Sequence, residues 1–174
     1  MSAPPAVQDD RADGHMKVLT NVLSGAGRLD GAGAPLDPQP WEWAGPHVLI
    51  EHADEARADA LAAALRRAGY SVACCPGPAA GGRCPLADDG CAAAAGADLV
   101  VSGLGFETTA ARDALGALRT RLPRLPVVLE VGAGDAERWP ELVDGCTVVA
   151  PPAAPEQVVA QVRATLRAQE SDAA

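Results

Sequence analysis

Two kinds of segment alternate along most of this chain. Short runs rich in Val, Leu and Ile are typical of strands that are buried on both faces of a sheet. These runs predict strands over 47–53, 70–75, 98–104, 125–131 and 146–152. The longer segments between them repeat apolar residues at helical spacing. They predict helices over 54–69, 107–122, 134–145 and 155–169, with a loop and a short helix over 76–97.

The first of these helices shows the pattern most fully. Leu61, Leu65 and Ala68 fall on one face of a helix over 54–69. Asp54 has the side chain of an N-cap residue, and Gly69 provides a natural stop at the other end.

Strands that alternate with helices predict an α/β fold, a five-stranded parallel sheet with helices on both faces. We expect the flavodoxin-like strand order 2-1-3-4-5. In that order the carboxyl ends of the first and third strands border the crevice where such folds bind ligands. Glu51, His52 and Gly103 stand at those ends.

The chain divides into an arm, a domain and a tail. Residues 1–45 are rich in Pro, Gly, Asp and Ala, which predicts a largely disordered arm. Within the arm, Trp41 and Trp43 are expected to cover the first strand. The α/β domain spans 46–169, and 170–174 form a disordered tail.

Charge narrows the classes of partner. The formal net charge is −9 and the pI is about 4.7. An acidic surface disfavours contact with a nucleic-acid backbone or an anionic membrane. No apolar run reaches the length of about 18 residues that spans a bilayer, and the first residues lack the pattern of a secretory signal. We therefore expect a cytoplasmic protein with protein partners or small ligands.

Four of the five cysteines crowd together: Cys74, Cys75, Cys84 and Cys91. Three interpretations stay open: buried apolar residues, a redox-sensitive thiol pair, or ligands to zinc or an iron–sulfur cluster. The C-x₂-C knuckles common in zinc sites are missing. We expect no cofactor on the first two interpretations, and Cys146 is predicted to be a core residue.

The segment 47–168 resembles the receiver domain of two-component response regulators. The stretches "LPVVLEVGAGDAERW" and "VVAPPAAPEQVVAQVRATLR" are similar to the family's fourth strand and to its fifth strand and last helix. Pro152 stands where the family has a proline. The resemblance implies a signalling role, and partners that bind the face made by the fourth helix, fifth strand and fifth helix.

The same resemblance implies a phosphorylation site, which this chain alters. The family uses an acidic pair, a phosphoaccepting aspartate, a Ser or Thr, and a Lys. The matching positions hold Glu51 and His52, Gly103, Val131 (Glu130 if the register shifts by one), and Pro151. Glycine has no nucleophile, and valine and proline cannot bind phosphoryl oxygens.

We therefore predict a pseudo-receiver, a receiver-like domain that lacks the phosphoacceptor. It is expected to be a regulatory module that binds other proteins, and not an enzyme. Its partner can be a second copy of the same chain, which would make a homodimer. The alternative prediction is a redox- or metal-responsive sensor that uses the four clustered cysteines.

Overall fold

The computed structural model describes residues 45–80, 84–87 and 90–172. Five parallel strands form one sheet in the order β2-β1-β3-β4-β5, which confirms the predicted topology. The strands are β1 (His47–His52), β2 (Ser71–Cys75), β3 (Leu99–Gly103), β4 (Val127–Glu130) and β5 (Thr147–Val149). The predicted arm, including both of its tryptophans, lies outside the described residues, apart from Gly45.

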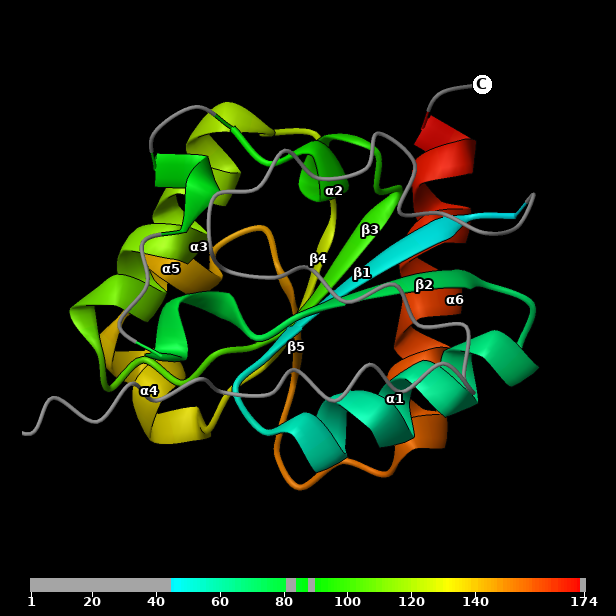
Figure 1. The fold of residues 1–174 in the computed structure, drawn as a ribbon, viewed down its shortest axis with the longest axis horizontal. Helices are drawn as coiled ribbons and strands as arrows, with labels where there is room; N and C mark the ends of the chain where they lie inside the picture. Colours follow the sequence, from blue (N-terminus) through cyan, green and yellow to red (C-terminus); the bar gives the residue numbers. More distant parts are fainter. Residues whose placement is uncertain (1–44, 81–83, 88–89, 173–174) are drawn as a thin grey trace, which may run out of the picture.

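Helices cover both faces of the sheet (Figure 1). They are α1 (Glu55–Arg67), α2 (Ala92–Ala95), α3 (Thr109–Arg121), α4 (Ala133–Arg138), α5 (Pro140–Val143) and α6 (Pro155–Asp172). Two 3₁₀ turns, η1 (Gly77–Ala80) and η2 (Pro85–Ala87), precede α2 in the connection from β2 to β3. No helix within the described residues is both long and apolar enough to cross a bilayer.

The start of α1 follows the sequence pattern. Asp54 caps the helix, because its side chain accepts a hydrogen bond from the Arg57 backbone N–H at 3.1 Å. Gly69 ends the same segment with a φ of 91°, a left-handed conformation that favours glycine.

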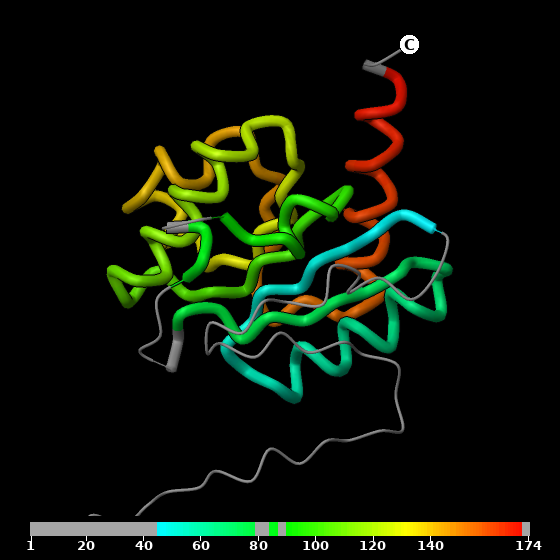
Figure 2. Tube along the Cα trace, turned by 45° about the horizontal axis from the view of Figure 1, so that its top comes forward, coloured from blue at the N-terminus to red at the C-terminus, as the bar shows by residue number. Residues whose placement is uncertain are grey.

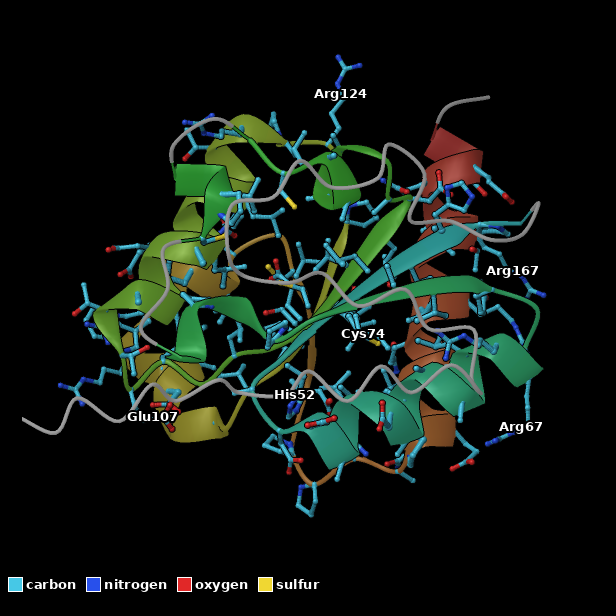
Figure 3. All side chains as sticks on the ribbon, viewed as in Figure 1. His52, Arg67, Cys74, Glu107, Arg124 and Arg167 are labelled. Atoms are coloured by element: carbon cyan, nitrogen blue, oxygen red, sulfur yellow. The ribbon has the colours of Figure 1, made fainter. Side chains whose placement is uncertain are left out.

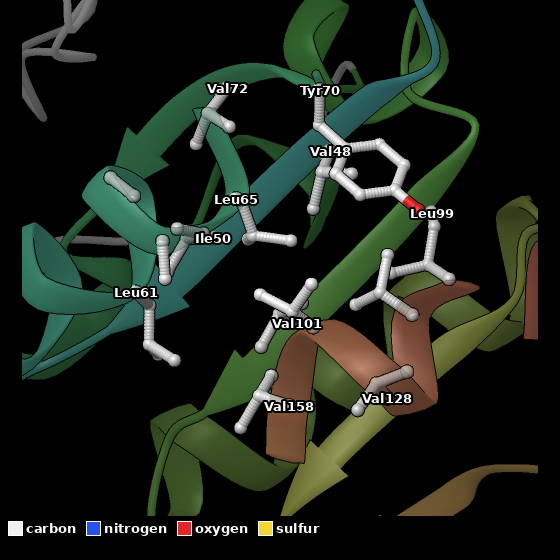
Figure 4. Packing of buried hydrophobic residues seen from close by; sticks show 14 of the residues in the cluster. Val48, Ile50, Leu61, Leu65, Tyr70, Val72, Leu99, Val101, Val128 and Val158 are labelled. Atoms are coloured by element: carbon white, nitrogen blue, oxygen red, sulfur yellow. The ribbon is translucent and has the colours of Figure 1, made fainter. Parts of the chain in front are cut away.

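Strand alternation divides the core into two layers. On one face, Val48 and Ile50 of β1 and Val101 of β3 pack against α1 and α6, as Figure 4 shows. On the other face, Leu49 and Val100 pack against α2 and α3. Because successive residues of a strand point to opposite faces, each strand serves both layers.

Several element boundaries differ from the prediction, most of all in the last third of the chain. The helix expected over 134–145 is divided into α4 and α5, since Pro140 lacks a backbone N–H and disfavours helical geometry at Trp139. Strand β5 is shorter than expected because the prolines after Ala150 cannot donate to a neighbouring strand.

The last helix is longer than expected. Helix α6 continues to Asp172, past its predicted end at 169, and its final turns project beyond the sheet (Figure 2). The Gln169 amide donates to the Arg124 carbonyl at 3.0 Å, which ties this end of the helix to the domain. The segment 170–172 is therefore helical where a disordered tail was expected.

Candidate functional site

A cavity of about 330 Å³ opens at the carboxyl ends of the strands. It lies where the 2-1-3-4-5 order places a ligand crevice. Four of the predicted pocket residues line it: His52, Gly103, Val131 and Pro151. So do five charged residues: Asp54, Arg57, Glu107, Glu130 and Asp135.

Glu51 and His52, which stand at the positions of the family's acidic pair, point to opposite faces of the sheet. His52 lies at the cavity, at the end of β1 and before the first turn of α1 (Figure 3). Glu51 is only 3% exposed and is not among the described residues that line the cavity. The expectation that both side chains share the crevice is therefore wrong, because neighbouring residues of a strand point in opposite directions.

The imidazole of His52 covers Gly103 on the neighbouring strand. The two residues are paired across β1 and β3. A Cβ atom added to Gly103 would lie 2.2 Å from His52 Cδ2 and 2.6 Å from Nε2, well inside contact distance. The His52 Nδ1 accepts a hydrogen bond from the Asp54 backbone N–H at 3.0 Å, which helps to fix the ring. Burial lowers the pKa of His52 from its ordinary value, although Glu130 and Asp54 oppose that effect, so the ring is neutral at pH 7.

A part-buried ion pair at the cavity joins α1 to the end of β4. The guanidinium of Arg57 donates to Glu130 Oε1 at 2.5 Å and to the Ala153 carbonyl at 2.8 Å. The Glu130 side chain is 5% exposed, and its Oε2 has no hydrogen-bond partner among the described residues. Arg57 is therefore a cation at the cavity that the sequence analysis did not identify.

The other two predicted pocket residues offer no charged group. Val131 is buried, and its backbone N–H is taken by the Val149 carbonyl at 3.1 Å. Pro151 is exposed at the rim, and its peptide bond to Pro152 is cis. The sequence analysis matched the family's Ser or Thr position either to Val131 or to Glu130. Both residues line the cavity, and Glu130 is the one with a carboxylate.

Glu51 belongs to a second polar group on the opposite face. It pairs with Cys75 on β2 and with Ser102 on β3, so the three residues form a row across the sheet. Burial raises the pKa of Glu51 to about 7, and the nearby Ser102 hydroxyl offsets part of that effect. Neither Glu51 Oε2 nor Ser102 Oγ has a hydrogen-bond partner of good geometry.

Three of the four clustered cysteines share this region. Cys75, Cys84 and Cys91 all pack against the core layer under α2 and α3. Burial raises the pKa of Cys75 to about 12 and also raises that of Cys84, and Glu51 and Cys91 are near enough to add to both effects. The two sulfurs each accept a backbone N–H bond from two residues ahead, at Gly77 and Leu86.

Cys74 is separated from the other three. It packs in the layer formed with α1 and α6, and Figure 3 shows its side chain on that side of β2. The structure therefore does not gather the predicted four-cysteine set. Within the described residues, no group of three or more His, Cys, Asp or Glu side chains is arranged to hold a metal ion. Cys146 packs against the α3 layer, half-buried, near the start of β5.

Sequence reasoning missed several cavity residues. Arg57 and Glu130 are 73 positions apart, and nothing in the pattern around either residue indicates their ion pair. Glu107 and Asp135 follow the ends of β3 and β4, and this position was an available signal, since residues after parallel strands gather at one edge.

Solved structures of known proteins resemble this fold. The sequence matches no protein-family model, and no curated protein matches it. Its structure is similar to a CheY-like response regulator receiver domain from Methanospirillum hungatei, with 16% identity and a TM-score of 0.57, covering 74% of this chain and 99% of that one. It is also similar to the regulatory domain of the repressor of iron transport regulator RitR in its inactive form, with 18% identity, a TM-score of 0.54, and coverage of 71% and 97%.

A third neighbour comes from a family of redox sensors in the streptococci that evolved from two-component response regulators. It shows 17% identity and a TM-score of 0.56. The match includes 72% of this chain and 53% of the neighbour, which is longer. Each of the three matches covers more than two thirds of this chain with a TM-score above 0.5. This chain therefore has the fold of response regulator receiver domains.

Proposed function

We propose that this chain is a cytoplasmic regulatory module that acts through protein partners and takes up no phosphoryl group at the end of β3. The receiver fold supports a role in signalling. The observation that carries the proposal is the His52 ring above Gly103. That ring fills the space in which a phosphoaccepting side chain would begin.

The charge of the cavity supports the same proposal. Asp54, Glu107, Glu130 and Asp135 bring four carboxylates to its wall. The single guanidinium there, of Arg57, is already paired with Glu130. A phosphoryl group is strongly anionic, so this cavity repels it. With Pro151 at the lysine position, the described residues that line the cavity include no lysine to compensate.

The test is direct exposure to small phosphodonors. The full chain is incubated with acetyl phosphate or phosphoramidate and Mg²⁺, beside an ordinary receiver domain as the positive control. Intact mass spectrometry should show a phosphoryl adduct on the control alone. An adduct on this chain that peptide mapping places at His52, or at any carboxylate of the cavity, would refute the proposal.

The partner surface is expected at α4, α5, β5 and α6, the face that receivers present. Among the described residues, Val148 on β5 is the large hydrophobic side chain that is exposed, at 45%. Its exposure on the edge strand supports a contact there. Sedimentation of the wild type, Val148→Asp and the control Thr120→Asp, an exposed residue of α3, tests self-association. A dimer that survives Val148→Asp would exclude this face, and a monomeric wild type would exclude the homodimer.

A second candidate function is a thiol-based sensor. It is favoured by the proximity of Cys75, Cys84 and Cys91, and by the streptococcal redox sensors among the structural neighbours. In the reaction, two thiols would lose two protons and two electrons and form one disulfide, while a peroxide is reduced to water. Burial keeps two of these thiols protonated, so the oxidation should be slow at neutral pH.

Thiol counting and elemental analysis separate the candidates. Protein purified without oxygen or a metal-binding tag is assayed for zinc, iron and free thiols, before and after peroxide. A disulfide between two of the three cysteines that changes the oligomeric state supports the sensor. Bound metal that is lost in Cys84→Ser, but kept in Cys74→Ser, supports the metal-responsive form. Five free thiols that persist after peroxide, without bound metal, exclude both forms.

A further inference from the structure

A second cavity lies at the amino ends of the strands, and we call it the amino-end cavity. Its volume is about 440 Å³, within the range of pockets that hold an organic group. Its apolar wall comes from the end of α2 and from the connection between α3 and β4, and includes Ala94, Ala97, Leu122, Leu125 and Pro126. These elements and the last turns of α6 lie at the same end of the sheet (Figure 1).

Two cations and one carboxylate stand beside this apolar wall. Arg121 and Arg124 line the amino-end cavity, and Figure 3 shows the Arg124 side chain directed outward from the domain. The carboxylate is that of Asp98, whose Oδ2 accepts the His47 backbone N–H at 2.7 Å and whose other oxygen can accept a further N–H. An occupant that matches this lining has an aromatic ring with an N–H group and a carboxylate next to the ring.

The chain outside the described residues joins the domain beside this cavity. The first described residue is Gly45, and the ring and backbone of His47, at the start of β1, bond to Gly96 and Asp98. The eight residues before Gly45 read "DPQPWEWA" (37–44), with two tryptophans on either side of a glutamate. The second of them, Trp43, is four residues from His47, a reach of up to about 13–14 Å.

The first strand itself offers these indoles no apolar face. Val48, Leu49 and Ile50 are completely buried in the two core layers, with β2 and β3 on either side. Indoles from the preceding segment therefore need another apolar contact, and the amino-end cavity lies next to the point where that segment joins the domain.

We propose that the segment 41–43 of this chain docks in the amino-end cavity of its own domain. The indole of Trp43 lies against the apolar wall and its N–H donates to Asp98, while the Glu42 carboxylate faces Arg124. The contact is intramolecular, so a short tether gives it an effective concentration of about mM order and modest affinity is enough. It lies at the opposite end of the sheet from the cavity with the altered phosphorylation residues, and it holds whether or not the proposed function does.

Tryptophan fluorescence of the full chain tests this contact. In a Trp41→Phe, Trp139→Phe background the emission comes from Trp43 alone. It should be blue-shifted and protected from acrylamide, compared with the same protein unfolded in urea. Ala95→Asp, an exposed change in the cavity lining, should bring both readings toward the unfolded values. Ala60→Asp, the same exposed change on α1, should leave them unaltered, and circular dichroism checks that both variants fold.

Charge reversal provides a second arm. Arg124→Glu should lower the ratio of protected to accessible Trp43 about two- to fivefold, as the loss of an exposed ion pair does. Arg67→Glu, on α1, is the matched control, and Glu42→Arg combined with Arg124→Glu should restore the ratio. A Trp43 as accessible as in urea would overturn the proposal. So would protection that persists in both Ala95→Asp and Arg124→Glu, or protection lost on dilution, which would place the indole on a second copy.

Discussion

The packing of His52 on Gly103 can be tested by adding a single methyl group. In Gly103→Ala the new Cβ would lie 2.2 Å from His52 Cδ2, where about 3.5 Å or more is normal between carbon atoms. The ring must move by more than an ångström to relieve this contact. It cannot do so freely, because the ring is half-buried and its Nδ1 accepts the Asp54 N–H. Overpacking of this kind costs typically about 1–3 kcal/mol.

The expected loss for Gly103→Ala is therefore about 2 kcal/mol, which lowers the Tm of a chain of this length by about 4–8 °C. In a His52→Ala background the obstacle is gone. There the same change should be neutral, or stabilising by about 0.5–1 kcal/mol, because alanine in a strand avoids the entropy cost of glycine. The coupling energy between the two sites should be about 2–3 kcal/mol.

Urea unfolding of the four proteins, followed by circular dichroism, gives this coupling energy directly. Each single variant must keep the m value of the wild type, so that the free energies can be compared. If Gly103→Ala costs the same with and without the imidazole, the ring does not fill the space above Gly103. The steric part of the argument against a phosphoacceptor would then fail.

Three further predictions concern buried polar groups. The pKa of Glu51 rises from 4.5 to about 7 on folding, so its contribution to stability is full below pH 4.5 and is lost as the pH rises through 7. Relative to Glu51→Gln, the wild type should lose up to about 3 kcal/mol over that range in urea titrations, and a constant difference would contradict this. Arg57→Ala should cost about 2–4 kcal/mol in the same assay, because it leaves Glu130 buried and unpaired, whereas Arg57→Met with Glu130→Leu should recover most of the loss. At about pH 8, Cys75 should react with iodoacetamide at least about tenfold more slowly in the native protein than in urea, as measured by peptide mapping, because its raised pKa leaves little thiolate; equal rates would refute its burial.

The order of strands could be predicted from the sequence because it depends on local signals. Apolar runs such as 47–53 and 98–104 and helix ends such as Asp54 and Gly69 are each readable within a few residues. Alternating strands and helices then leave few arrangements, and the parallel order follows.

The candidate site depended on information that is not local. The face to which a residue points is set by the register of its strand, and a shift of one residue exchanges Glu51 with His52, or Cys74 with Cys75. The Arg57–Glu130 pair forms only when α1 packs on the sheet and the Arg57 side chain reaches the end of β4, and no sequence periodicity encodes that contact. Motif comparison could therefore identify which groups the pocket lacks, but not which groups replace them.

The shortness of β5 limits how a second chain can dock. This strand is an edge of the sheet and offers only Thr147–Val149 for pairing before Pro151 and Pro152, which have no N–H to donate. An incoming strand would find too short a ladder to extend the sheet by main-chain hydrogen bonds. Recognition at this edge must therefore come from side chains, so single substitutions should be able to redirect the choice of partner without altering the fold.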